Sequence, residues 1–166
     1  MVSFSVKAIT PKQKFGNKGW LDAIATTQRQ TTVPRLRALF RKTVVGWSNK
    51  PDFGWAQRRD ADSMSITMYP QGQYADIWTL VNEGSPRHNI PKSGTTWMSY
   101  RPGYRAATRP GSLQSNRAYR SGKYQTSYKI NHPGFEARDF LKQIAEEYEN
   151  PYMNEIQEAI NKVAKS

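Results

Sequence analysis

Apolar side chains recur along this chain with two different periods, which predict both helices and strands. A helix is predicted over residues 34–47, with Pro34 in its first turn, because the apolar positions have helical spacing: Leu36, Leu39, Phe40, Val44 and Trp47. A weaker helical pattern covers residues 20–25. In residues 4–9 apolar and polar side chains alternate, so this stretch could be a short strand or an ordered arm. Residues 52–62 are polar and are expected to be irregular.

Four further stretches favour β-structure. Residues 63–69 and 74–82 are predicted to form a hairpin around the turn at 70–73. The second of these strands is apolar on both faces near its end, which is typical of an inner strand. A third strand is predicted over residues 95–101, and a fourth over residues 123–130, where side chains alternate in character.

The pattern changes from strand to helix around residues 131–140. Pro133 lacks a donor for a strand ladder, and Gly134 permits a positive φ, so the preceding strand must end here. From Phe135 to Tyr148 most apolar side chains fall on one helical stripe, which can cover the sheet that has just ended. We therefore interpret this stretch as the joint between the two layers of an α+β domain.

A second helical pattern follows at Asn150-Pro151, a pair that suits the start of a helix. The two helical stretches form either a helical hairpin or one kinked helix. The predicted fold is therefore α+β: an antiparallel sheet of about four strands packed against an N-terminal helix and two C-terminal helices, with a long basic hairpin loop. Residues 1–166 fit a single domain, in which residues 1–18 form a possible N-terminal arm.

Residues 102–122 have little to build a core, and we predict an extended loop there. So long a connection within a domain is usually functional or disordered. We interpret it as a hairpin tip or arm that becomes ordered against another molecule, the alternative being a flexible loop without a role.

Composition narrows the classes of protein. The chain has no cysteine, which excludes a disulfide framework and thiolate metal sites, and no apolar run approaches the roughly 20 residues that span a bilayer. We expect a soluble protein made in a cytoplasm. His88 and His132 both lie near prolines in turns and are expected to be polar loop residues. No phosphate loop, nucleophile elbow or pair of catalytic carboxylates is present, so no enzyme activity, cofactor or metal site is predicted.

Positive charge is concentrated in the middle of the chain. The net charge is +12, and residues 84–135 contain nine Lys or Arg and no Asp or Glu, whereas residues 136–166 contain seven Asp or Glu and four Lys or Arg. A stretch without carboxylates cannot neutralise itself, so a polyanion or an acidic protein surface is a plausible partner, the alternative being a solvated basic surface.

The basic residues of this middle stretch are interleaved with tyrosines, as in grooves that bind single-stranded nucleic acid. Arg and Tyr are also the residues that anchor protein interfaces, and composition does not separate the two. The candidate residues facing another subunit or DNA are Arg101, Arg105, Arg109, Arg117, Arg120 and Lys123.

Several motifs, in their order, resemble the minor tail-component family of tailed bacteriophages, the tail-completion, neck or tail-terminator family typified by the gene-ten product of a lambdoid phage. The motifs are VVGW at 44–47, KPDF at 50–53, VNEGSPRHNIPK at 81–92, YRAATRPG at 104–111 and HPGFEARDF at 132–140. They extend over most of the chain from about residue 34 onward. Ser85 departs from the threonine expected after the glycine.

The resemblance implies a structural protein of the virion at the head-to-tail junction, assembled in the host cytoplasm. Such a protein forms a ring, most often a hexamer, that joins the tail tube to the neck. Its partners would be further copies of itself, neighbouring connector and tail-tube proteins and, through the basic loop, packaged DNA, with no membrane contact. The alternatives are a basic nucleic-acid-binding protein of phage or bacterial origin and, with no supporting motif, a metal-dependent hydrolase.

The motifs around the joint also give a structural hypothesis. Glu83 and Arg138 end their elements on either side of the joint, and we expect their side chains to lie close together. The joint is predicted to consist of Glu83, Gly84, His132, Pro133, Gly134, Arg138 and Phe140.

Overall fold

The computed structural model describes residues 3–9, 17–90, 98–100, 103–105, 108–113, 119–121, 123, 125–127 and 130–165. The helices are α1 (Asn17–Thr27), the π-helix η1 (Gln28–Thr32), α2 (Val33–Lys42), α3 (Ala75–Glu83) and α4 (Phe140–Ala164). The strands are β1 (Phe4–Ile9), β2 (Asp52–Arg59), β3 (Ser63–Gln71), β4 (His88–Ile90), β5 (Met98–Tyr100), β6 (Gly103–Arg105), β7 (Tyr119–Ser121), β8 (Gln125–Ser127) and β9 (Ile130–His132). The predicted α+β class is confirmed.

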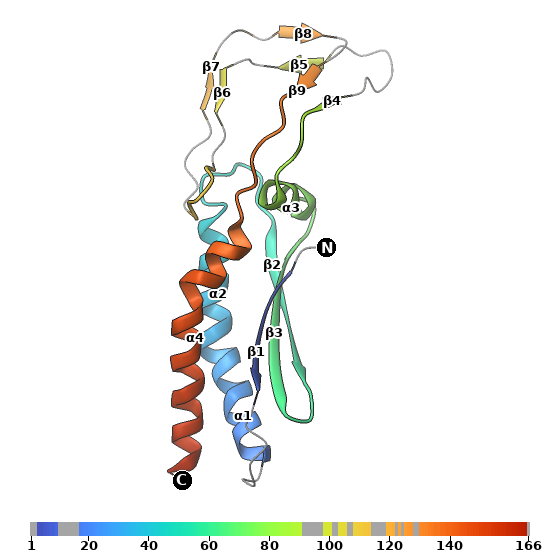
Figure 1. Ribbon diagram of the computed structural model, residues 1–166. Coiled ribbons are helices and arrows are strands. Elements are labelled where there is room, and N and C mark those ends of the chain that lie inside the picture. The colour runs from blue at the N-terminus through green and yellow to red at the C-terminus, as the bar shows by residue number, and fades with distance from the viewer. Residues whose placement is uncertain are drawn as a thin grey trace.

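The body of the molecule has two layers, a sheet and a layer of helices (Figure 1). The sheet is antiparallel with the strand order β1-β3-β2. Helices α1, η1 and α2 follow one another without leaving helical backbone geometry, and α4 runs alongside them. The C-terminal end of α4 therefore lies beside α1, at the end of the body opposite to α3.

β3 is the central strand because it pairs with β1 on one side and with β2 on the other. Its alternate residues Met64, Ile66 and Met68 are at most 3% exposed, whereas Ser65 and Thr67 between them are half-buried. One face of the sheet is thus apolar and buried, as the twofold periodicity of a strand requires. The predicted strand at 63–69 is confirmed, and residues 4–9 form a strand of this sheet.

Four aromatic rings connect the two layers at the end of the body near α3. Phe40 of α2 lies 5.1 Å from the ring of Phe53 and 5.6 Å from that of Trp78, and Trp78 lies 5.7 Å from Phe140. Aromatic pairs at such distances add about 0.5–1.5 kcal/mol each to the effect of burial. The indole of Trp78 is completely buried and donates a hydrogen bond to Thr43 Oγ1 at 2.9 Å, which satisfies its only polar atom. Phe140 of the predicted joint is therefore a core residue.

The prediction that residues 74–82 form a strand is wrong, because they form α3. Trp78 and Asn82, four residues apart, are buried, whereas Ile77 and Leu80 are about half exposed. This is the burial pattern of a helix covered on one side only. Ile77 and Leu80, two of the apolar residues that suggested an inner strand, remain in contact with solvent.

The prediction of an irregular segment at 52–62 is also wrong. Residues 52–59 form β2, whose whole length pairs with β3, from Asp52↔Gln71 to Arg59↔Met64. Two of its polar side chains are bonded to helix α1. Arg59 Nη1 is 2.6 Å from Asp22 Oδ1 of α1, and Gln57 Nε2 donates to the carbonyl of Ala25. Polar composition therefore concealed a strand that is stabilised by its main-chain bonds.

The C-terminal part of the chain differs from the prediction in two ways. Residues 135–139 are not helical, and α4 begins at Phe140 after Asp139, whose φ of 50° lies in the left-handed region. The two predicted C-terminal helices are one helix, which continues through Pro151. Buried residues before and after this proline, Tyr148 and Tyr152 among them, face the same neighbouring helices, and this packing keeps the two halves in line.

The predicted helix at 34–47 ends earlier, at Lys42, and residues 43–46 form a turn. The weaker helical pattern at 20–25 lies within α1, so the helix predicted there is confirmed.

The remaining strands do not join the main sheet. β4 pairs with β9, β5 with β8, and β6 with β7, each pair antiparallel. Residues 88–132 are here called the arm, and its described strands form these three pairs beyond the end of the body (Figure 1). The predicted third and fourth strands correspond to β5 and β8, and the predicted loop at 102–122 contains the pair β6–β7. The sheet of about four strands is therefore a three-stranded sheet plus an arm.

Candidate functional site

The arm joins the body at two neighbouring points that are hydrogen-bonded to each other. Ser85 N donates to Phe135 O at 2.9 Å, and Phe135 N donates to Ser85 O at 2.8 Å. On the body side, the amides of Arg138 and Asp139 donate to the carbonyls of Val81 and Asn82 in the last turn of α3. The chain enters and leaves the arm through this joint. Residues 133–139 therefore connect the arm to the body, whereas the sequence predicted that they connect the sheet to the helix layer.

Two glycines allow the close approach of the two chain segments at the joint. Gly84 has a φ of 79°, and a Cβ atom there would lie 2.6 Å from the amide nitrogen of Ala137. Gly134 has a φ of 78°, and its Cβ would collide with the carbonyl oxygen of Ser85 and lie 2.7 Å from the carbonyl carbon of Pro86. No other residue type meets both requirements, since side chains rarely adopt a positive φ and backbone atoms cannot move aside.

The predicted contact between Glu83 and Arg138 does not form. Glu83 is exposed, and no ion pair joins it to Arg138. The side chain of Arg138 turns instead into the protein, where the residue is only 8% exposed. Its Nε donates to Thr108 Oγ1 at 3.3 Å, and its Nη1 donates to the carbonyl of Glu136 at 2.9 Å.

The contact between Arg138 and Thr108 shows that the middle of the arm returns to the body. Thr108 is 5% exposed, and Leu113 packs against the hydrophobic core. Residues 108–113 are therefore fixed to the body, whereas the sequence suggested that this part of the arm extends away from it. The outer strands β4, β5, β8 and β9 lie beyond this anchored segment (Figure 1).

The predicted basic residues are distributed over this arm. Arg109 and Lys123 are exposed. Arg105 lies opposite Tyr119, and Arg120 lies opposite Tyr104, in the pair β6–β7. Arg101 and Arg117 lie outside the described residues. Of the two other predicted joint residues, Pro133 is exposed, and His132 in β9 is paired with His88 in β4.

The described strands of the arm form three separate pairs. Each pair has two strands, and no further described strand joins its outer edges. Isolated two-stranded pairs are only marginally stable in water, and open edges readily accept a further strand. This part of the chain is therefore suited to contacts with another molecule.

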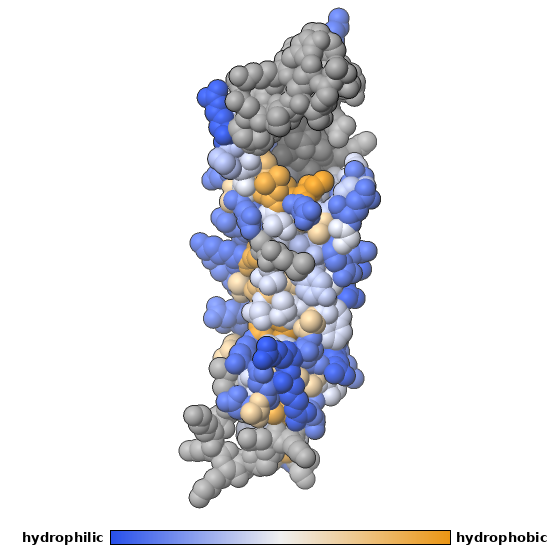
Figure 2. Space-filling view, turned by 90° about the vertical axis from the view of Figure 1, so that its right-hand side faces the viewer, coloured by the Kyte–Doolittle hydropathy of each residue, from blue (hydrophilic) through white to orange (hydrophobic). Residues whose placement is uncertain are grey.

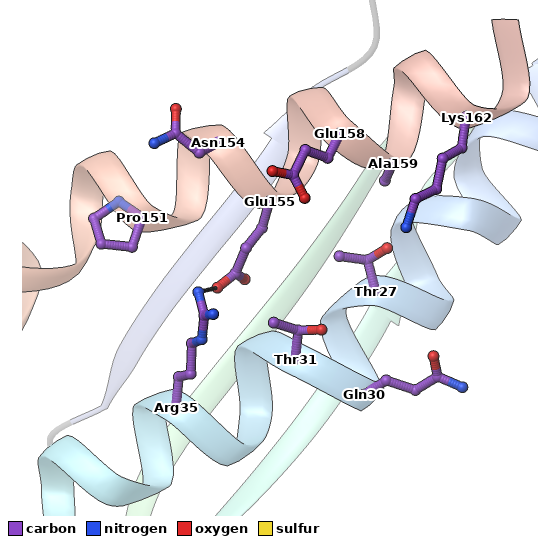
Figure 3. A pocket seen from close by; sticks show the side chains of 10 residues that line it. All are labelled: Thr27, Gln30, Thr31, Arg35, Pro151, Asn154, Glu155, Glu158, Ala159 and Lys162. Atoms are coloured by element: carbon purple, nitrogen blue, oxygen red, sulfur yellow. Dashed lines mark hydrogen bonds and ion pairs between the residues drawn. The ribbon is translucent and has the colours of Figure 1, made fainter. Parts of the chain in front are cut away.

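A second candidate site, which the sequence did not indicate, lies between the helices of the body (Figure 3). A pocket of ≈ 440 Å³ opens between η1, α2 and α4. Its polar lining contains both acidic and basic groups, together with hydroxyl and amide groups. The lining residues are Thr27, Gln30, Thr31, Arg35, Pro151, Asn154, Glu155, Glu158, Ala159 and Lys162.

Glu155 forms the inner wall of this pocket and is fully hydrogen-bonded. Arg35 Nη1 donates to Oε1 at 2.7 Å, and Thr32 Oγ1 donates to Oε2 at 2.7 Å. The hydroxyl of Tyr148 also donates to this carboxylate and lies 2.8 Å from Oε1 and 2.7 Å from Oε2. Since both oxygens of this buried carboxylate are engaged, Glu155 connects α4 to η1 and α2 and does not offer a free base.

A second chain of hydrogen bonds begins one turn away. Gln28 Nε2 donates to Tyr152 Oη at 3.0 Å, and Gln57 Nε2 donates to Gln28 Oε1 at 2.9 Å. Burial raises the pKa of Tyr152. Burial also raises the pKa of Tyr148 far above its ordinary value, and the hydrogen bond to Glu155 raises it further. Both hydroxyl groups therefore remain protonated and take part in a structural network of hydrogen bonds.

The helical stripe of α4 contained a signal for this network. Glu155 falls in the same row of positions as Tyr148, Tyr152 and Ala159, all of which are buried. A carboxylate inside an apolar row predicts a buried partner. Its partners Thr32 and Arg35 are more than a hundred residues away, so the sequence did not identify them.

No family model, curated protein or solved structure matches the chain. Within the described ranges, no three His, Asp or Glu residues lie together in an arrangement that could hold a metal ion. None of the helices there is both long enough and apolar enough to span a bilayer.

Proposed function

We propose that this protein is a structural component of a bacteriophage head–tail junction, a tail-terminator or tail-completion protein. In this proposal it forms an oligomeric ring, most simply a hexamer, that joins the tail tube to the neck of the virion. The neighbouring molecules would be further copies of the chain and the connector and tail-tube proteins above and below the ring.

One observation carries the proposal: the described strands of the arm form separate two-stranded pairs, and the arm is connected to the packed body through a tightly fitted joint. Such an arm gains most of its stability when another chain covers it, because two strands alone bury little surface. The motifs that resemble the tail-completion family support the same proposal, since three of the five, at 81–92, 104–111 and 132–140, lie at the joint or in the arm.

Charge supports assembly from copies of the same chain. The arm region is cationic and lacks carboxylates, whereas residues 136–166 carry an excess of acidic residues, among which Glu146 and Glu149 are exposed. In a ring each subunit uses two different surfaces to contact its neighbours, so opposite charges on two parts of one chain attract consecutive copies.

A specific feature favours the second candidate, nucleic-acid binding. In β6–β7 two arginines lie opposite two tyrosines, Arg105↔Tyr119 and Arg120↔Tyr104. Cations paired with aromatic residues have the composition of segments that contact phosphates and stack bases. In a neck ring this strand pair would contact packaged DNA; in a free protein it would be the main binding site.

Mass measurement and DNA binding distinguish these functions. For a ring component we expect native mass spectrometry and sedimentation of the purified protein to detect a discrete oligomer, with weak DNA binding. A protein that stays monomeric at every concentration, and whose DNA affinity falls steeply with salt in gel-shift titrations, would contradict the ring and support the nucleic-acid function. Electron microscopy of the virion with this chain labelled would locate it directly.

A further inference from the structure

One face of α3 combines exposed apolar and acidic residues. Ile77 and Leu80 are 49% and 48% exposed, although both are large hydrophobic side chains. Asp76 and Glu83 are exposed on the same side of the helix and form no ion pair with any residue that the structure describes. The buried residues Trp78 and Asn82 occupy the opposite side. These four exposed residues, Asp76, Ile77, Leu80 and Glu83, are here called the α3 face.

The position of the α3 face suits a contact between subunits. Figure 2 views the side of the molecule on which Figure 1 places α3, and hydrophobic surface is visible there near the arm end of the body. The arm begins a few residues after α3, so the face and the arm lie at the same end of each subunit. In a ring of subunits arranged side by side, the arm ends of neighbouring copies adjoin, so the α3 face of one subunit lies near the point where the arm of the next leaves its body.

The arm has the composition that complements this face. The chain from 84 to 135 has nine cationic residues and no carboxylate, and the arm is rich in aromatic residues: Trp97, Tyr100, Tyr104, Tyr119, Tyr124 and Tyr128. Aromatic residues and arginine are the side chains that most often anchor interfaces, and the cations would meet Asp76 and Glu83 at the two ends of the apolar pair. Within its own subunit the arm leaves Ile77 and Leu80 half exposed, so the face is available to another copy.

We propose that the α3 face binds the arm of a neighbouring copy of this chain. The interface deepens the proposed ring function and depends on it. Ile77 and Leu80 supply the apolar centre of the contact, and Asp76 and Glu83 select the cationic partner. Among the described residues α3 carries two exposed large hydrophobic side chains, Ile77 and Leu80, whereas α4 carries one, Met153. The exposed Glu147 of α4 is already paired with Lys42.

The test compares variants of the full-length protein that are matched in chemistry. Ile77→Asp combined with Leu80→Asp is expected to raise the dissociation constant of the oligomer about tenfold or more, because it places charge in the apolar centre. The control Met153→Asp makes the same kind of change at a residue that is 64% exposed elsewhere, and should leave the constant unchanged. Asp76→Lys with Glu83→Lys should also weaken the oligomer, because it removes the acidic groups that meet the cationic arm. Circular dichroism and thermal melting verify that each variant is folded.

A crosslinking experiment identifies the occupant. A photoreactive amino acid replaces Leu80 in unlabelled protein, which is mixed with ¹⁵N-labelled wild-type protein and irradiated. We expect crosslinked peptides that join the α3 face of the unlabelled copy to residues 88–132 of the labelled copy. A wild-type ring whose crosslinks from position 80 reach only other regions, or only the same copy, would overturn this interface and leave the ring proposal intact. A wild-type protein that remains monomeric would overturn both.

Discussion

The carboxylate of Glu155 is held at the residue scale by groups from three helices. Thr32 of η1, Arg35 of α2 and Tyr148 of α4 donate to it from 2.7 to 2.8 Å, and the residue is 6% exposed. The exposed arginine leaves one end of this network in contact with water, since its side chain is 58% exposed. A buried ion pair contributes less than its distances suggest, but loss of one partner leaves the others unsatisfied.

Substitution of this carboxylate tests the network. Glu155→Gln should lower the free energy of unfolding by about 1–3 kcal/mol, because the amide loses the charge and presents a donor to groups that themselves donate. Glu158→Gln is the matched control, since Glu158 lines the same pocket from the same helix but is exposed, and its effect should stay within about 0.5 kcal/mol. Urea denaturation measures both. Equal effects of the two substitutions would show that the network does not stabilise the fold.

The pKa of Tyr148 predicts a loss of stability at high pH. Its pKa is raised in the folded protein, so as the pH rises above the ordinary value of 10.0 the unfolded chain releases this proton while the folded chain retains it. The unfolded state is then favoured, and the free energy of unfolding should fall with increasing pH from about pH 10 upward. Tyr148→Phe should make this fall shallower. Denaturation curves recorded across that range provide the measurement, and an unchanged slope in the variant would contradict the prediction.

At the scale of elements, the joint between α3, the arm and α4 depends on backbone geometry. Gly134 and Gly72 both have a positive φ, of 78° and 84°. They differ in their surroundings, because a Cβ at Gly134 would meet the backbone of Ser85 and Pro86, whereas a Cβ at Gly72 would meet nothing within 4 Å. Substitutions at the two positions therefore separate the free-energy cost of the left-handed conformation from the cost of the steric collision with the backbone.

Alanine substitution should reveal this difference. Gly72→Ala is expected to cost about 1 kcal/mol, the usual penalty of a left-handed conformation for a residue with a Cβ. Gly134→Ala should cost more than that, by about 2 kcal/mol or above, because backbone atoms at the joint would have to move. Chemical denaturation gives both values. If Gly134→Ala proved as mild as Gly72→Ala, the joint would be more adaptable than its geometry indicates.

Secondary-structure predictions succeeded where the periodicity was clear and failed where tertiary packing determined the secondary structure of the segment. β3 alternates strictly and was predicted, whereas Ile77, Trp78, Leu80 and Val81 in α3 contain too many apolar residues for either period to be read. The segment is a helix with one buried face, because neighbouring elements cover Trp78 and leave Ile77 exposed. Similarly, Pro151 suggested a break, but the common packing surface of Tyr148 and Tyr152 maintains one helix.

At the scale of the whole molecule, the body and the arm differ in how they are stabilised. The fully buried rings of Phe40, Trp78 and Phe140 belong to the body, and Thr108 and Leu113 of the arm pack against it. The two ends of the arm are adjacent, since His88 pairs with His132. The arm can therefore be removed without separating the elements that it connects.

Replacement of residues 89–131 by an Asn-Gly turn tests this division. We expect the shortened protein to keep its helical circular dichroism and a cooperative melt, with a modest loss of stability from the missing contacts of Thr108 and Leu113. It should also lose self-association, which native mass spectrometry would detect. A shortened protein that does not fold would show that the arm belongs to the folding unit, and one that still forms the wild-type oligomer would show that the arm is not the assembly element.

The sequence by itself determined the class of the fold, the strand at 63–69, the end of the β-structure before Phe135 and the concentration of positive charge in residues 84–135. Each of these depends on neighbours along the chain: a periodicity, a proline beside a glycine, or a run without carboxylates. The tertiary structure alone decided that α3 is a helix, that α4 is continuous, that Arg138 turns toward Thr108 and not toward Glu83, and that Glu155 receives bonds from distant helices. These outcomes depend on which surfaces meet in space, and distances between residues far apart in the chain are not encoded in any local pattern.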